Sequence, residues 1–211
     1  MFHSSIVAFP WDLVDEGLDA ALDLVQGEIG ATSLSVWAST PPIGQMRARP
    51  LSPRCFQTDG GLFFQPDAAL YEDSRCKPPT ADWIKSRNPF ARISEGCQTR
   101  KLGLRANISL TKVGPLAERH PSAACKNVFG TPSHRSVCLS NPDVQAMLAA
   151  LVRDLTSNYV VAAVVLADLD VAWGEALDLP IPVQGEEVGL LRRLLSLCFC
   201  ESCRQTVAAS G

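Results

Sequence analysis

The stretch "SNPDVQAMLAALVRDLTSNYVVAAVVLADLD", residues 140–170, decides the fold class. Asn141 is a strong N-cap residue and Pro142 suits the first position of a helix. The apolar run after Tyr159 has the length of a strand and is too short to span a membrane. A helix followed directly by an apolar strand is typical of α/β proteins with a mostly parallel sheet. The apolar stripe that predicts this helix consists of Val144, Met147, Leu148, Leu151, Val152 and Leu155.

Three segments upstream of this unit also have the character of strands. The stretch "SSIVAFPW", residues 4–11, contains a short apolar strand that ends at Pro10. Residues 31–39 and 101–110 alternate between two kinds of side chain, as a strand with two different faces does. Together with the strand before Asp168, they predict four strand–helix pairs.

The helices between these strands have their own local signals. Asp12 is expected to cap the first helix, which Gly27 or Gly30 would end. A second helical region is predicted over about residues 80–99, and Asn88-Pro89 inside it fits an N-cap followed by a first-turn proline.

The alternation of side chains in residues 31–39 and 101–110 distinguishes between two possible architectures for the sheet. An open doubly wound sheet and half of a (β/α)8 barrel both fit four strand–helix pairs, and neither a G-x-G-x-x-G motif nor a P-loop is present. A sheet covered by helices on both faces favours apolar residues on both. We therefore expect a partial (β/α) barrel whose polar face lines the lumen. The apolar faces hold Leu34, Val36, Leu104, Ala106 and Ile108, and the polar faces hold Ser33, Ser35, Trp37, Arg105 and Asn107.

Composition sets the boundaries of this interpretation. The 211 residues are 46% hydrophobic and 19% charged, which suits one α/β domain over residues 1–211 with long loops at about 40–80 and 111–140. A net charge of -3 gives no reason to expect nucleic-acid binding, and no run is long enough for a membrane span. The N-terminus lacks the features of a signal peptide, so we expect a cytoplasmic protein whose eight cysteines remain thiols.

Two carboxylates end the fourth predicted strand. Asp168 and Asp170 are two residues apart and so share one face of an extended chain. In a barrel the functional site lies at the carboxyl ends of the strands, where such a pair suits acid/base or nucleophilic chemistry on a sugar. The structural alternative is that one carboxylate caps the following turn and the other is solvated.

Other candidate residues surround the same edge. Trp37 closes the second strand and Trp173 follows the fourth, so both are placed to stack on sugar rings, although a buried tryptophan at a barrel rim is also common. His120 and Asn127 lie in the loop after the third strand and are candidates to bind substrate hydroxyls. An exposed loop histidine without a role is the alternative for His120.

The segment "LCFCESCR", residues 197–204, concentrates three of the cysteines. A last helix is predicted from about Glu186 through these cysteines. On a continuous helix Cys200 and Cys203 share a face, whereas Cys198 points nearly the opposite way. We therefore expect no metal site and no cofactor here. A metal-dependent protein that uses the cluster remains the third class of function, for which elemental analysis is the test.

Several quoted motifs together resemble a family of uncharacterised bacterial proteins that look like TIM barrels of the glycoside-hydrolase type. They are "FPWDLVDEGLDAALDLV", "HPSAACKNVFG", "CLSNPDVQAMLAALVRDLTSNY" and "LCFCESCR". The related barrels tend to carry the strand acid one residue earlier, where this chain has Ala167. Such a shift reverses the face of Asp168 unless a bulge corrects it.

The resemblance implies a glycoside-hydrolase-like protein that acts on or binds a carbohydrate. Asp168 would be the leading catalytic acid or nucleophile and Asp170 the second, while Trp37, Asn107, His120 and Asn127 would line the substrate mouth. The alternative is a degenerate barrel that serves as a binding or scaffold protein. A full barrel needs about 250 residues, so we expect this half-barrel to pair with itself or with a missing C-terminal half.

Overall fold

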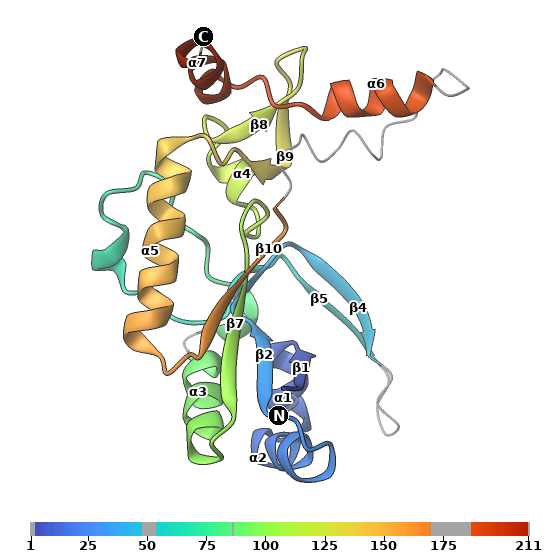
Figure 1. The fold of residues 1–211 in the computed structure, drawn as a ribbon, viewed down its shortest axis with the longest axis vertical. Helices are drawn as coiled ribbons and strands as arrows, with labels where there is room; N and C mark the ends of the chain where they lie inside the picture. The colour runs from blue at the N-terminus through green and yellow to red at the C-terminus, as the bar shows by residue number, and fades with distance from the viewer. Residues whose placement is uncertain (1–2, 48–53, 86, 170–186, 211) are drawn as a thin grey trace.

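The computed structural model describes residues 3–47, 54–85, 87–169 and 187–210. Its centre is a four-stranded sheet in which every neighbouring pair is parallel, and the strands follow one another in chain order (Figure 1). The predicted strands are thus confirmed, and the chain has an α/β fold. The strands are β1 (Ser5–Ala8), β2 (Ser33–Trp37), β7 (Gly103–Ser109) and β10 (Ala163–Ala167).

The first helical region differs from the single helix that the sequence predicts. Helix α1 (Pro10–Glu16) is capped by Phe9, and Asp12 lies in its first turn, so the assignment of Asp12 as the cap was wrong. Because proline has no backbone N–H that would be left without a partner, it suits the first helical position, and the helix starts three residues earlier than predicted. At Gly17 the backbone takes a φ of 89°, a conformation that favours glycine, and the chain restarts as α2 and a π-helical turn. These are α2 (Leu18–Asp23) and η1 (Leu24–Glu28).

The two predicted caps at Asn88 and Asn141 are confirmed, but the region predicted as helical over about residues 80–99 becomes an α-helix only at Pro89, because its earlier part holds the 3-10 turn Asp82–Ile84. The Asn88 side chain accepts a hydrogen bond from the backbone N–H of Ala91 at the start of α3 (Pro89–Thr99). In the same way Asn141 accepts from the N–H groups of Asp143 and Val144 at the start of α5 (Pro142–Asn158). Each cap satisfies helix donors that would otherwise lack a partner, which is worth about 1 kcal/mol.

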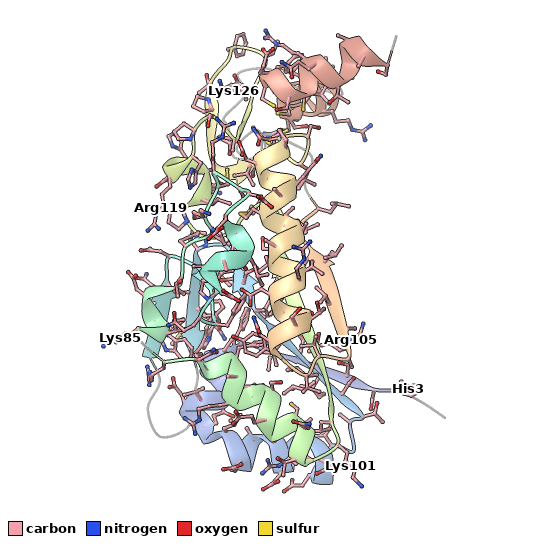
Figure 2. All side chains as sticks on the ribbon, turned by 90° about the vertical axis from the view of Figure 1, so that its left-hand side faces the viewer. His3, Lys85, Lys101, Arg105, Arg119 and Lys126 are labelled. Carbon is pink, nitrogen blue, oxygen red and sulfur yellow. The ribbon has the colours of Figure 1, made fainter. Side chains whose placement is uncertain are left out.

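The two faces of the sheet have different environments. The apolar face packs against the helices in one core, to which α3 and α5 contribute Phe90, Ile93 and Leu151. In Figure 2 these two helices lie in front of the strands. On the polar face Val7 is 65% exposed and Arg105 is exposed, so the described residues leave part of this face open. The apolar-face residues Leu34, Val36, Leu104, Ala106 and Ile108 are all fully or almost fully buried.

Both long loops contain regular structure. The first holds the antiparallel hairpin β4–β5 (Ile43–Arg47 and Arg54–Thr58), the short pair β3–β6 (Ser39–Thr40 and Gly61–Leu62) and two 3-10 turns (Ala68–Tyr71 and Asp82–Ile84). The second holds α4 (Leu116–Arg119) and the antiparallel pair β8–β9 (Ala124–Lys126 and Pro132–Val137). This second segment lies beyond the carboxyl end of β7 (Figure 1).

The C-terminal segment forms two helices instead of one continuous helix. Helix α6 (Glu187–Ser196) stops before the cysteines, and α7 (Glu201–Ala209) begins directly after Cys200. Between them the N–H of Phe199 donates to the carbonyl of Lys126 on β8, at 2.7 Å. None of the helices in the described part of the chain has the length and apolar character needed to cross a membrane.

Candidate functional site

A buried polar pair marks the carboxyl half of the polar face. The Ser35 hydroxyl donates to Oδ1 of Asn107 across β2 and β7, at 2.8 Å, and both residues are buried. Within the described residues, no partner binds Nδ2 of Asn107. Since an amide nitrogen carries two N–H donors, this group can donate to a ligand oxygen.

Trp37 lies beside this pair. It is the partner of Asn107 in the β2–β7 register, and paired residues of neighbouring parallel strands share a face. Its ring stacks on Phe9 with a centroid distance of 6.1 Å, and Phe9 stacks in turn on the buried Trp11 at 4.5 Å. Trp37 is only half-buried, so this edge of the sheet exposes part of an aromatic ring whose position is stabilised by stacking on Phe9.

Asp168 stands where the chain leaves β10. Ala167 is the last paired residue, opposite Ser109, and Asp168 then takes the left-handed conformation with a φ of 54°. Strand alternation ends before Asp168, so its direction follows from this turn in the backbone and not from the face of the strand. The Thr111 hydroxyl holds the Asp168 carbonyl at 2.8 Å.

One carboxylate oxygen of Asp168 lacks a hydrogen-bond partner within the described residues. This oxygen, Oδ2, is buried. A buried acceptor without a partner costs about 1–3 kcal/mol. Such groups deserve a functional explanation, and a ligand donor would supply the missing bond.

The remaining predicted residues lie elsewhere or outside the described part. Asp170 and Trp173 fall in the undescribed residues 170–186. Asn127 Oδ1 accepts from the backbone N–H groups of residues 129 and 131, so its oxygen stabilises the turn between β8 and β9. His120 follows α4 near Asp143 at the start of α5, and its charge contributes to lowering the pKa of that carboxyl after the larger effect of Arg75.

The structure thus brings together Trp37 and Asn107, with Asp168 on the next strand, and places His120 and Asn127 around β8–β9. Sequence reasoning missed the contribution of Phe9 and the roles of Ser35 and Thr111. For Ser35 the signal was present, because it alternates with the apolar positions of its strand and falls on the same face as Trp37.

The cysteines converge, in contrast to the expectation from a continuous helix. The sulfurs of Cys138, Cys198, Cys200 and Cys203 all lie within 4.8 Å of one another. The geometric objection was wrong because the helix is interrupted before Cys198, so the angular spacing of a helix does not apply to this residue. This cluster is the second site of chemical interest in the chain.

Comparisons with known proteins were made for sequence and for structure. No protein-family model matches the chain, and no curated protein matches it. Among solved structures, alpha-L-fucosidase isoenzyme 2 from Paenibacillus thiaminolyticus is similar with a TM-score of 0.58 at 12% identity, over 100% of this chain and 26% of that chain.

Two further structures are similar at a lower level. A noncanonic maltogenic alpha-amylase from Thermotoga neapolitana has a TM-score of 0.47 at 10% identity, over 90% of this chain and 42% of that chain. A hypothetical protein from Ruminiclostridium thermocellum ATCC 27405 has a TM-score of 0.46 at 10% identity, over 89% and 88%. This chain therefore spans about a quarter of the fucosidase, and at 12% identity that likeness concerns the fold alone.

Proposed function

We propose that the carboxyl edge of the parallel sheet binds a carbohydrate, as the N-terminal part of a (β/α) barrel of the glycoside-hydrolase type. Two features support the barrel over a doubly wound sheet. The four strands follow one another in chain order, and among the described residues only one face of the sheet belongs to the helix-packed core. In a doubly wound sheet the order reverses and helices cover both faces.

The buried, unpartnered Oδ2 of Asp168 is the observation that carries the proposal. Sugar hydroxyls are donors that suit a carboxylate oxygen, and they also accept from an amide such as Nδ2 of Asn107. The half-buried ring of Trp37 offers the apolar surface on which a sugar ring stacks. Acceptor, donor and aromatic surface come from three neighbouring segments at one edge of the sheet.

Hydrolysis is the further step of the proposal. Cleavage of a glycosidic bond needs two carboxyl groups on opposite sides of that bond. Asp168 would act as the catalytic acid or nucleophile, with Asp170 as the second candidate for that role. The other carboxylate of the pair would come from a later strand of a longer or assembled protein. If no such pair forms, the same edge serves as a carbohydrate-binding or scaffold site.

The test compares Asp168→Asn with a matched control, Asp73→Asn, because Asp73 is an exposed carboxylate. Asparagine tolerates the left-handed conformation of residue 168, so the fold should survive. Binding is measured by calorimetry against a panel of oligosaccharides, and turnover with aryl glycosides. We expect wild type and Asp73→Asn to bind equally and Asp168→Asn to lose at least tenfold in affinity or turnover.

Two results would overturn this proposal. Wild type that neither binds nor hydrolyses any member of the panel would remove the carbohydrate role. Equal activity of Asp168→Asn and wild type would remove Asp168 from the site. If binding depends on Asp168 but no glycoside is turned over, the binding form of the proposal holds and the hydrolytic form does not.

The open polar face also bears on partners and location. We propose that a second copy or a further part of the barrel covers this face, on which Val7 is 65% exposed. Light scattering that shows only a stable monomer would contradict this. We also propose a cytoplasmic location, in which the eight cysteines would remain thiols.

A further inference from the structure

The thiol cluster joins two parts of the chain that are far apart in the sequence. Cys138 directly follows β9, whereas Cys198, Cys200 and Cys203 come from the segment around the start of α7. The sulfurs of Cys138 and Cys203 lie 3.4 Å apart across a separation of 65 residues. Cysteines that only fill gaps in a core have no reason to gather in this way.

The local backbone explains the convergence. The N–H of Phe199 donates to the carbonyl of Lys126, which places Cys198 and Cys200 on either side of a strand-like contact with β8. Cys200 then has the extended conformation of an N-cap, with a ψ of 166°, and Cys203 follows in the first turn of α7. A paired C-x2-C with a ligand from a distant hairpin is a common arrangement of tetrahedral thiolate sites.

The spacing of the sulfurs fits one metal ion. Zinc binds four thiolates tetrahedrally at a Zn–S distance of about 2.3 Å, which places the sulfurs about 3.8 Å apart. The four sulfurs here lie within 4.8 Å of one another and one pair is at 3.4 Å, so changes on the order of 1 Å bring them to that geometry. A disulfide requires a sulfur separation of about 2.05 Å, and all eight cysteines are free.

Few apolar contacts attach α7 to the rest of the described structure, so the thiol cluster is its main point of attachment. Helix α7 has no buried residue, and its Val207 is 71% exposed. Figure 1 shows α6 and α7 at the same end of the molecule as the β8–β9 hairpin, one on each side of it and away from the four-stranded sheet. In Figure 2, Lys126 on β8 lies at one end of the molecule, and Lys101, which precedes β7, lies at the other end. The apolar contacts around the thiols amount to little more than Leu195 and the cysteines themselves.

A fifth cysteine lies next to the four. Cys125 on β8 is buried and belongs to the same cluster, but its sulfur is not among the four that lie mutually within 4.8 Å. Cys125 is therefore placed to donate a hydrogen bond to a bound thiolate without being a ligand itself.

We propose that Cys138, Cys198, Cys200 and Cys203 bind one zinc ion, which fastens the C-terminal helix to the β8–β9 hairpin. Each thiol loses its proton as it binds, and the four Zn–S bonds replace the small apolar contact as the main attachment of α7. The ion is fully coordinated by protein sulfur and has no open position for substrate, so its role is structural.

The test uses the full chain, purified under reducing conditions and without chelator. Elemental analysis should find one zinc per chain in wild type. Cys55→Ser is the matched control, because Cys55 is an exposed cysteine outside the cluster. We expect Cys55→Ser to retain full zinc and Cys125→Ser to retain most of it, whereas Cys138→Ser and Cys203→Ser should lose zinc affinity at least a hundredfold.

Two further measurements keep the proposal testable where a variant fails to fold. Cobalt added to metal-free wild type should give the absorption bands of tetrahedral Co²⁺ with thiolate charge transfer. Removal of zinc by a chelator should increase amide hydrogen exchange in residues 197–209 and leave α5 unchanged. Absence of both zinc and cobalt binding in the reduced protein would overturn the proposal, as would stoichiometric iron, a native disulfide, or equal zinc in Cys138→Ser. None of these readouts depends on carbohydrate binding.

Discussion

The carboxylate of Asp154 allows a quantitative prediction about the attachment of the first long loop to α5. Asp154 is fully buried, and its Oδ2 accepts from the Tyr71 hydroxyl at 3.1 Å and from the N–H of Asp67 at 3.0 Å. Its Oδ1 accepts from Asn158 at 2.8 Å. Replacement of Asp154 by alanine removes all three acceptor contacts at once.

The expected loss of stability depends on whether each former donor to Asp154 can find another partner in the variant. Asp67 and Asn158 are exposed and can turn to water, whereas Tyr71 is 3% exposed and its hydroxyl is left without a partner. A buried donor without a partner costs about 1–3 kcal/mol, and the charge-assisted bond adds a similar amount. We expect Asp154→Ala to lower the free energy of unfolding by about 2–4 kcal/mol, or to lower Tm by roughly 6–12 °C for a chain of this size.

A double-mutant cycle gives the sharpest assay. Tyr71→Phe alone should cost about 1.5–2 kcal/mol in urea unfolding, because it removes a hydrogen bond to a charged group. In the Asp154→Ala background the same change should be neutral or stabilising, because it removes the unpartnered hydroxyl. If Tyr71→Phe costs the same in both backgrounds, the hydroxyl does not depend on Asp154 and the reasoning fails.

Burial raises the pKa of Tyr71, and the Asp154 carboxylate raises it further. In the unfolded chain a tyrosine ionises near pH 10, whereas folded Tyr71 stays neutral there. The unfolded state is therefore favoured increasingly as the pH rises above about 10, and wild type loses stability. Tyr71→Phe should lose less stability over the same range, and parallel pH profiles would contradict this.

Three further predictions concern single residues. Gly61→Ala should lower the free energy of unfolding by at least ~2 kcal/mol more than Gly30→Ala, as measured in urea. Both glycines have a positive φ, which costs an alanine about 1 kcal/mol, but of the two only Gly61 would place a Cβ 2.4 Å from a backbone oxygen. Equal losses would refute this. Burial raises the pKa of Cys97 to about 11, so stability should fall between about pH 9 and 11 in wild type and less in Cys97→Ala. Thr111→Val should cost about 1 kcal/mol in the same assay by freeing the Asp168 carbonyl, and a loss near zero would show that another donor replaces it.

Local signals were sufficient for most of the regular structure. The alternation of residues 31–39 and 101–110 predicted β2 and β7, and the pairs at Asn88 and Asn141 predicted the starts of α3 and α5. These elements depend on strand period and helix caps, which are properties of neighbouring residues. The break at Gly17 was missed because apolar periodicity continues across it.

The candidate site was only partly predictable, because part of it depends on contacts between residues that are far apart in the sequence. The pairing of Trp37 with Asn107 follows from strand faces, which the sequence contains. The unpartnered oxygen of Asp168 depends on a backbone turn and on Thr111, 57 residues away. The thiol cluster depends on the contact of Phe199 with Lys126, and the helical periodicity of residues 188–198 points to the wrong geometry.

The sulfur contact between Cys138 and Cys203 has a consequence for how the length of this chain can vary. It closes a loop of 65 residues that contains α5, β10 and the connection to α6. The entropy of closing such a loop grows only with the logarithm of its length, so doubling it costs about 0.6 kcal/mol. The attachment of α7 to the β8–β9 hairpin should therefore depend little on the number of residues between Cys138 and Cys203, since the thiols would still return the C-terminal helix to the same hairpin.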